Sequence, residues 1–118
     1  MKKINVVKEN KDFAKIINNG KKYWNDTFSI YYDNNNCEKY RFGISVSKKI
    51  GNAVIRNKIK RQLRMIVYKY KNIYSNGKDY IIIVKRNYIN LNFSEVEQKY
   101  VELIKKITHT KENLYDKK

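Results

Sequence analysis

The sequence has no proline, a single cysteine, a single histidine, and only 11 acidic residues against 27 basic ones. The lone Cys37 excludes an internal disulfide and is typical of a reducing compartment. No apolar run reaches the roughly 20 residues that span a bilayer, and the N-terminal residues lack the apolar segment and cleavage site of a secretory signal. We therefore expect a cytoplasmic protein without a membrane anchor.

The same scarcity bears on catalysis. A protein nuclease usually needs clustered carboxylates that hold metal ions, or a pair of histidines. The only histidine, His109, lies near the C-terminus. Asp79, Glu95 and Glu97 are explained by a turn and by helix caps, and no Walker loop, cysteine cluster or dinucleotide fingerprint is present. We therefore expect no catalytic residue and no metal site in this chain.

What the sequence has in excess is positive charge, with a net charge of +16 and a pI near 9.9. Its composition, 42% hydrophobic and 14% aromatic, is too apolar for a disordered chain. Without repeats or a flexible linker, residues 1–118 are expected to form a single domain with a frayed tail from about residue 109. So basic a domain attracts polyanions, of which nucleic acid is the leading candidate and an anionic membrane surface the alternative.

The first half of the chain predicts one helix followed by strands. Residues 10–20 show helical spacing of apolar side chains and end in a glycine, and residues 21–25 are expected to be extended. Residues 27–33 and 40–47 alternate between two kinds of side chain, as strands with one buried face do. We expect these two strands to form an antiparallel pair across the Asn-rich loop between them.

The second half predicts helix, strand and helix. A helix is expected from about residue 52 to residue 71. Its apolar stripe consists of Ile55, Ile59, Leu63, Ile66 and Tyr70. Residues 79–86 form a continuous apolar run, typical of a strand buried on both faces, and a last helix is expected to begin near Asn92 or Ser94, each followed at capping-box spacing by a glutamate. The predicted class is α+β, a small two-layer sandwich of helices against a mostly antiparallel sheet.

The helix expected over 52–71 has a cluster of basic residues beside its apolar stripe. At about 100° per residue, these side chains gather along one flank. The members of this flank are Arg56, Asn57, Lys60, Arg61, Arg64 and Lys71, with Lys58 further round. No acidic residue lies between Lys48 and Lys71, so salt bridges along the helix cannot account for the charge. We interpret the flank as an anion-binding surface, on which arginine can fork onto a phosphate; DNA, RNA and acidic lipid all stay open on these grounds.

The stretch "SVSKKIGNAVIRNKIKRQLR", residues 45–64, resembles the signature of the protein subunit of bacterial ribonuclease P. In that family a strand ends in SKK-x-G-x-A-V and continues into a helix with R-N-x-x-K-R-x-x-R. The matching residues are Ser47, Lys48, Lys49, Gly51, Ala53, Val54, Arg56, Asn57, Lys60, Arg61 and Arg64. The resemblance extends to the early "DF" followed by a glycine, the aromatic strand "FSIYY" and the strand "DYIII".

This resemblance implies a ribonucleoprotein enzyme that removes the 5′ leader from precursor tRNA by endonucleolytic cleavage. The RNA subunit would hold the catalytic magnesium ions, and the protein would bind that RNA and the leader and lower the magnesium requirement. No membrane and no further protein partner are implied. The implied fold is an α-β-β-β-α-β-α sandwich with a left-handed strand–helix–strand crossover, where the general rule predicts a right-handed one.

Carried over residue by residue, the resemblance implies two RNA-binding surfaces. The first, which contacts the RNA subunit, consists of Lys48, Lys49, Arg56, Asn57, Lys58, Lys60, Arg61 and Arg64. The second is a leader cleft between the first helix and the sheet, similar to the family's at Phe13 and Tyr31. Tyr31 lies on the strand face opposite Phe28 and Ile30, so it can stack on an unpaired base; the alternative is that Phe13 and Tyr31 are core aromatics.

The chain departs from the family in places, and other classes compete. Ile17 stands where many relatives have a second aromatic residue, and Lys58 stands where arginine is commoner, which keeps the charge but loses the fork. A ribosomal-protein-like module that binds structured RNA would show the same charge. A membrane-surface binder would need large apolar residues free to insert, whereas the apolar stripe is better used as core. The ordered SKK…RN…KR…R string favours the ribonuclease P subunit.

Overall fold

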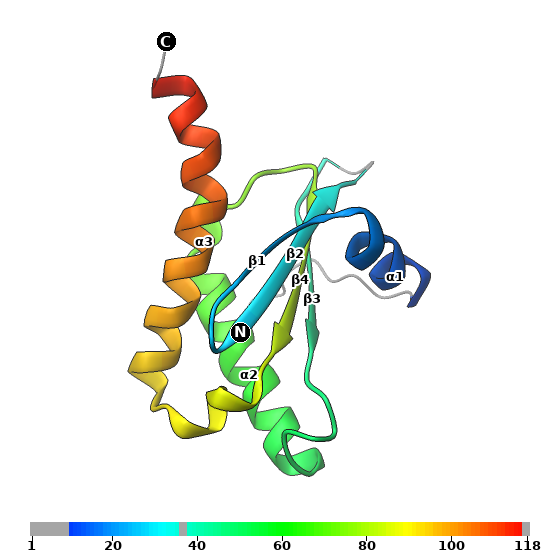
Figure 1. The fold of residues 1–118 in the computed structure, drawn as a ribbon, viewed down its shortest axis with the longest axis vertical. Coiled ribbons are helices and arrows are strands. Elements are labelled where there is room, and N and C mark those ends of the chain that lie inside the picture. The colour runs from blue at the N-terminus through cyan, green and yellow to red at the C-terminus, as the bar shows by residue number, and fades with distance from the viewer. Residues whose placement is uncertain (1–9, 36–37, 117–118) are drawn as a thin grey trace.

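The computed structural model describes residues 10–35 and 38–116, with side chains from residue 13 to residue 108 outside the gap. Three helices flank a four-stranded sheet (Figure 1). In chain order the elements are α1 (Asn10–Asn19), β1 (Lys21–Trp24), β2 (Phe28–Asn34), β3 (Arg41–Ser45), α2 (Ala53–Lys69), the 3-10 turn η1 (Lys71–Ile73), β4 (Lys78–Val84), the 3-10 turn η2 (Arg86–Asn90) and α3 (Phe93–Asp116). The predicted α+β class and the predicted order of helices and strands are confirmed.

The strand pairing differs from the prediction in one respect. The sheet order is β1-β2-β4-β3, with β4 antiparallel to β2 and parallel to β3. The predicted pair of β2 and β3 is therefore wrong, because β4 lies between them. Being the most continuously apolar strand, β4 is stabilised by the central position, where both of its faces are buried. Helix α2 connects β3 to its parallel neighbour β4. This β3–α2–β4 connection is the strand–helix–strand crossover for which the family resemblance implies a left-handed sense.

The two faces of the sheet are covered by different helices. Tyr80, Ile82 and Val84 of β4 belong to the large core that α2 and α3 complete, whereas Ile81 and Ile83 on the opposite face belong to a small cluster with α1. Figure 1 shows α1 on one side of the sheet and α2 and α3 on the other. The sandwich therefore has a thick side with two helices and a thin side with one short helix.

The core on the thick side is rich in tyrosine. The hydroxyl of Tyr74 donates to the Val67 carbonyl at 2.8 Å and shares a hydrogen bond of 2.7 Å with the hydroxyl of Tyr100. Burial raises the pKa of Tyr100 well above its ordinary value, so this hydroxyl stays neutral inside the core. Paired hydroxyls let large aromatic side chains fill the core without an unsatisfied polar group.

The helix boundaries follow from capping residues. The side chain of Asn52 accepts from the Ile55 backbone N–H at 3.0 Å at the start of α2. At the start of α3, Asn92 and Glu95 exchange two side-chain to backbone hydrogen bonds of 2.9 Å each, which confirms the capping box predicted at Asn92. Helix α3 continues to Asp116, into the segment expected to be frayed, because residues 109–116 contain no glycine or proline to end it.

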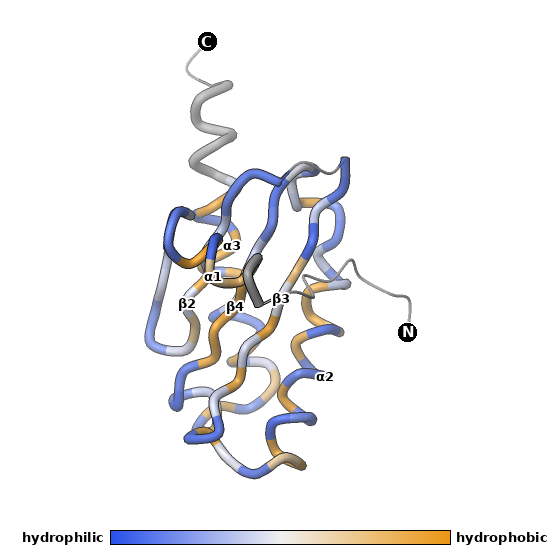
Figure 2. The backbone as a smooth tube through the Cα atoms, turned by 90° about the vertical axis from the view of Figure 1, so that its right-hand side faces the viewer, coloured by the Kyte–Doolittle hydropathy of each residue, from blue (hydrophilic) through white to orange (hydrophobic). Residues whose placement is uncertain are grey.

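The apolar stripe predicted for α2 is buried in its middle, with Tyr70 half-buried at its end and Ile55 exposed at its start. Ile59, Leu63 and Ile66 are buried, whereas Ile55 is 42% exposed. Placing Ile55 in the core was therefore wrong, because α2 begins beyond the edge of the sheet and its first turn has little to pack against. The helix in Figure 2 alternates between apolar and polar colours along its length, as expected of a helix with one buried face. Within the described residues, no helix combines the length and apolar character that crossing a membrane requires.

The junction between α1 and β1 leaves no room for a side chain. A Cβ at Gly20 would lie 2.5 Å from the Ile16 carbonyl oxygen and 2.6 Å from the Tyr32 carbonyl oxygen, and backbone atoms cannot rotate away. At Gly51 a Cβ would meet only the side chain of Ile55, at 2.9 Å. We predict that Gly20→Ala lowers the free energy of unfolding by about 1–3 kcal/mol, measured by urea denaturation.

The matched control for this prediction is Gly51→Ala, which should cost less because the exposed Ile55 side chain can move. Equal losses for the two variants would contradict the close backbone packing at Gly20.

Candidate RNA interface

The basic residues of α2 form a continuous surface with the loop that precedes the helix. We call this the α2 basic surface; it consists of Lys48, Lys49, Arg56, Asn57, Lys60, Arg61 and Arg64. Asn57, Arg61 and Arg64 are exposed, and Arg56 and Lys60 are half-buried. Among the ion pairs that the structure shows in its described part, none involves a member of this surface. Its positive charge is therefore available to an external anion.

The backbone around Gly51 holds the start of this surface in place. The Arg56 guanidinium Nε donates to the Gly51 carbonyl oxygen at 3.2 Å, and the Lys49 backbone N–H donates to the Ser47 hydroxyl at 3.2 Å. Buried Ile59 and Leu63 fix the helix against the sheet behind these residues. A rigid helix presents its cations without the entropy cost of ordering a flexible segment on binding.

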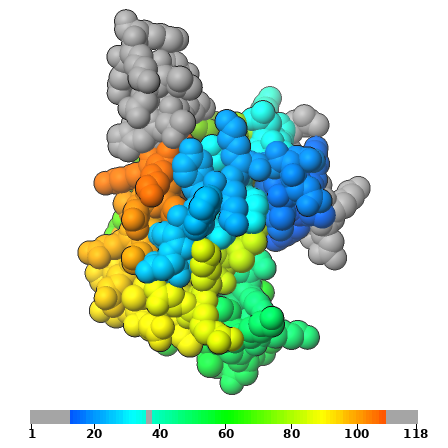
Figure 3. All heavy atoms as spheres, in the orientation of Figure 1, coloured from blue at the N-terminus to red at the C-terminus, as the bar shows by residue number. Residues whose placement is uncertain are grey.

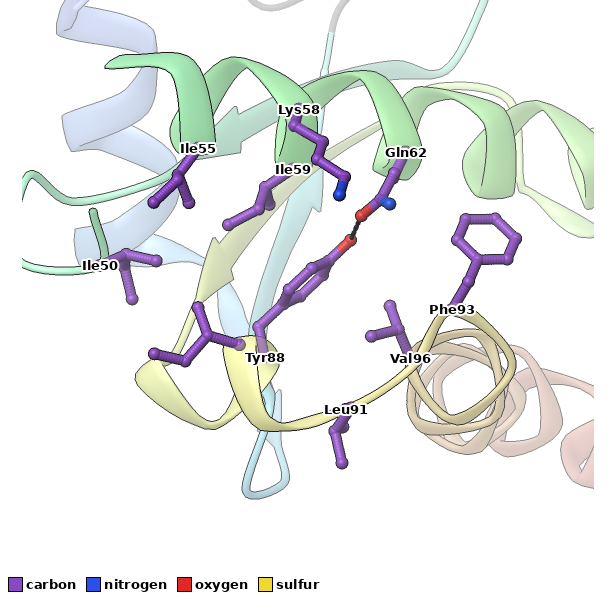
Figure 4. Close-up of a pocket in the computed structure, with 10 residues that line it drawn as sticks. Ile50, Ile55, Lys58, Ile59, Gln62, Tyr88, Leu91, Phe93 and Val96 are labelled. Carbon is purple, nitrogen blue, oxygen red and sulfur yellow. Dashed lines mark hydrogen bonds between the residues drawn. The ribbon is translucent and has the colours of Figure 1, made fainter. Parts of the chain in front are cut away.

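The opposite flank of α2 faces α3, and one of its cations is paired with an acidic residue of that helix. Lys69 pairs with Glu97 of α3 at 2.7 Å, and the Lys69 ammonium lowers the pKa of that carboxyl below its ordinary value. Lys58 lies on this flank as well, beside Gln62, in a pocket between α2, η2 and α3 (Figure 4). Lys58, predicted as part of the RNA-contacting set, is thus separated from Arg56 and Lys60 by the width of the helix.

The pocket beside Lys58 has a volume of about 310 Å³ and is mostly apolar. Tyr88 of η2 lies at its floor and donates to the Gln62 side-chain oxygen at 2.8 Å. Burial raises the pKa of Tyr88 to about 12, so the hydroxyl remains a donor at neutral pH. The exposed Ile55 and Phe93 line its wall.

A second candidate surface is the thin side of the sheet, where α1 packs. Phe13 and Ile16 of α1 lie against Ile81, and a Cβ at Gly43 would come within 2.5 Å of the Phe13 ring. Helix α1 therefore rests directly on β2 and β4 and approaches β3 at Gly43, where glycine allows the close contact. Phe13 is half-buried in this contact, so it packs the helix onto the sheet without being fully enclosed.

Tyr31 lies beside α1 on the same face of the sheet. Phe28 and Ile30 of the same strand are fully buried in the thick side, whereas Tyr31 belongs to the small cluster under α1 and is half-exposed. The prediction that Tyr31 faces away from Phe28 and Ile30 is confirmed. The ammonium of Lys22, on the neighbouring strand β1, lies 5.4 Å from the Tyr31 ring centroid. Sequence reasoning missed Lys22, although the alternation of "KKYW" could have placed it on one face of an edge strand.

Two acidic strand residues, Asp33 of β2 and Asp79 of β4, lie opposite each other on this face, and Asp79 is neutralised within the protein. Asp79 is buried and accepts two hydrogen bonds from the Arg41 guanidinium, at 2.8 and 2.6 Å, and one from the Asn35 amide at 2.7 Å. Such a bidentate pair leaves little negative charge to repel a phosphate. Figure 2 shows β2, β4 and β3 side by side from left to right, with α1 over the β2 and β4 part of the sheet and α2 to the right of β3.

The structure offers no protein site for a catalytic metal within its described part. No group of three or more His, Cys, Asp or Glu side chains there could hold a metal ion. The side chains of Cys37 and His109 lie outside the described residues.

A compact α+β domain with an unpaired basic helix flank and a half-exposed tyrosine on the sheet has the features of proteins that bind nucleic acid. The family model "Ribonuclease P" matches residues 1–108. The chain is 44% identical over 108 residues to the ribonuclease P protein component of Mycoplasma mycoides, covering 91% of this chain and 99% of the relative. It is 36% identical over 107 residues to the Bacillus cereus protein of the same name, covering 90% and 93%. The chain belongs to the ribonuclease P protein family, as the sequence signature predicted.

Solved structures agree with this assignment. The RNase P protein of Staphylococcus aureus matches with a TM-score of 0.81 and 36% identity, over 87% of this chain and 94% of that one. The RNase P protein of Thermotoga maritima matches with a TM-score of 0.78 and 29% identity, over 86% and 96%. The chain is therefore a component of a ribonucleoprotein endoribonuclease, with a role in tRNA processing together with an RNA subunit.

Proposed function

We propose that the chain binds ribonuclease P RNA through the α2 basic surface and the 5′ leader of precursor tRNA on the sheet beside α1. In this way it assists the catalytic RNA in removing the leader. The observation that carries the proposal is the row of unpaired cations along one flank of a helix whose other flank is fixed to α3. Ribonuclease P RNA and precursor tRNA are the partners in this proposal, in the cytoplasm, and no membrane or further protein is required.

The α2 basic surface suits a folded RNA for reasons of geometry and charge. Arg56, Lys60 and Arg64 recur once per helical turn, so their cationic groups line up along the helix. Arginine can make two parallel hydrogen bonds to a phosphate, and an asparagine such as Asn57 can reach a sugar or phosphate oxygen. Lys58 joins this contact only if the RNA also covers the α3-facing flank. With a net charge of +16, the chain is attracted to RNA over long distances before any contact forms.

The sheet beside α1 suits an unpaired strand. Sequence-tolerant binding of single-stranded RNA combines aromatic platforms with positive charge along the backbone, and Tyr31 with Lys22 supplies both. Phe13 closes one side of the platform. Mature tRNA has no leader to place there, so this surface favours the precursor over the product.

Magnesium belongs to the RNA subunit in this proposal. The described residues contain no carboxylate cluster for a metal ion, which supports assigning the catalytic magnesium ions to phosphate ligands of the RNA. The protein's cations neutralise phosphates that would otherwise require magnesium, so the holoenzyme should need less of it than the RNA alone.

The first prediction concerns the α2 basic surface. Arg64→Ala should weaken binding of ribonuclease P RNA and reduce the slope of log affinity against log salt by about 0.7–0.9, the contribution of roughly one phosphate contact. The measurement is a filter-binding titration at several potassium concentrations. Lys105→Ala, which removes an exposed charge from α3, is the matched control and should leave the slope unchanged. Identical slopes for Arg64→Ala and wild type would show that this arginine is merely solvated.

The second prediction concerns the leader. Tyr31→Ala should weaken precursor tRNA binding by about five- to a hundredfold, because stacking on one base is worth roughly 1–3 kcal/mol. Mature tRNA binding should hardly change. The measurement is the affinity of the reconstituted holoenzyme for both tRNAs, with Tyr31→Phe as the control that keeps the ring. Equal losses for both tRNAs would mean that Tyr31 supports the fold or the subunit contact instead of the leader.

A further inference from the structure

The most exposed aromatic side chain that the structure describes is Trp24, at the end of the edge strand β1. It is 61% exposed and belongs to neither apolar cluster of the described residues. It is also the only tryptophan in the chain. A large indole left in water contributes little to stability, so a function outside the fold is the natural explanation for its position.

Trp24 lies on the same face of the sheet as Tyr31. In the pairing of β1 with β2, Lys22 is opposite Tyr31 and Trp24 is opposite Ser29. Because side chains alternate between faces along a strand, Lys22, Trp24, Ser29 and Tyr31 all point to the side that α1 partly covers. Trp24 and Tyr31 are therefore diagonal neighbours on adjacent strands, a relation that places such residues about 7–8 Å apart.

Lys22 connects the two rings. Its ammonium lies 5.4 Å from the Trp24 ring centroid and 5.4 Å from the Tyr31 ring centroid. The order aromatic, cation, aromatic is the combination with which proteins hold successive bases of a single strand and the phosphate between them.

One acidic residue shares the face of this strip: Asp33, two residues beyond Tyr31 on β2 and on the far side of Tyr31 from Trp24. Helix α1 packs on β2 and β4 and on Gly43 of β3. Ser29, the residue opposite Trp24 on β2, is small and buried. Asp26, the acidic residue next in sequence, lies 3.2 Å from the Lys99 ammonium. Figure 3 shows the surface of β1, in mid-blue, beside that of α1, in dark blue. A polyanion is thus the occupant that the charge of this strip favours.

We propose that Lys22 and Trp24 form a second base-binding position on the leader path. One unpaired base stacks on Tyr31, the adjacent base stacks on Trp24, and Lys22 contacts the phosphate that joins the two nucleotides. Because the Lys22 ammonium lies 5.4 Å from each ring centroid, each ring is assigned a base of its own. This inference rests on the proposed binding of the leader at Tyr31 and extends it toward the β1 edge.

The experiment uses the holoenzyme reconstituted with its RNA subunit and precursor tRNAs whose leaders are shortened by one nucleotide at a time. Trp24→Ala should weaken binding of the longest leader by about five- to tenfold, the lower part of the range for base stacking, because β1 is an edge strand. As the leader is shortened, each variant should stop losing affinity relative to wild type once the nucleotide bound by the missing ring is absent. These leader lengths should differ by one nucleotide between Trp24→Ala and Tyr31→Ala. Trp24→Phe should retain most of the affinity, and Phe93→Ala, which removes an exposed aromatic from the thick side, should show no dependence on leader length.

A second readout does not depend on affinity. Because Trp24 is the only tryptophan, the fluorescence of the holoenzyme reports on this residue alone, provided that the RNA is unlabelled. Precursor tRNA with a long leader should quench it through stacking, and mature tRNA should not.

The outcomes separate this inference from the proposed function. If Tyr31→Ala weakens precursor binding while Trp24→Ala and the fluorescence show no leader dependence, the second position does not exist and the first stands. If neither variant discriminates precursor from mature tRNA, the proposed leader surface itself is wrong. Quenching by mature tRNA, or by the RNA subunit alone, would assign Trp24 to another RNA contact and overturn the inference.

Discussion

The arrangement of this protein depends on burying β4 on both of its faces. Its alternating side chains serve two different layers, with Tyr80 and Ile82 in the core under α2 and α3, and Ile81 under α1. Only the central position between β2 and β3 satisfies both, and α2 is then the connection that brings the chain from β3 back to β4. The strand therefore fixes the place of α2 and leaves the opposite face to one short helix, which covers it only in part.

The two functional surfaces follow from that constraint. Because α2 is fixed against the sheet and tied to α3 through Lys69 and Glu97, its other flank can hold a row of mutually repelling cations without ion pairs of their own. Such a row destabilises an isolated protein and is compensated when phosphates bind. On the thin side, the incomplete cover leaves Tyr31 and Lys22 accessible next to Phe13. The proposed contacts with the RNA subunit and with the leader thus use separate surfaces, one on α2 and one on the face of the sheet that α1 partly covers.

The features that depend on residues close together in the chain could be predicted from the sequence. The capping residues Asn52 and Asn92 and the orientation of Tyr31 depend on neighbours close in the chain, and the structure confirms them. The pairing of β2 with β4 depends on a strand that comes more than forty residues later, so a single sequence favours the nearer, wrong partner. Ile55 was misplaced because helical periodicity does not say where the sheet beneath a helix ends. Lys58 lies on the flank that faces α3, and its contact with RNA stays a prediction. The exposure of Trp24 could not be predicted from the sequence, because an aromatic residue in a short strand usually belongs to the core.

The central claim is that this chain supports RNA catalysis without performing it. The most direct measurement is cleavage of precursor tRNA at low magnesium concentration by the RNA subunit alone, by the chain alone, and by the two together. We expect rapid 5′-leader removal only for the combination, with the RNA alone recovering activity as magnesium is raised. Cleavage by the purified chain free of RNA, or no stimulation of the RNA subunit at any magnesium concentration, would contradict it.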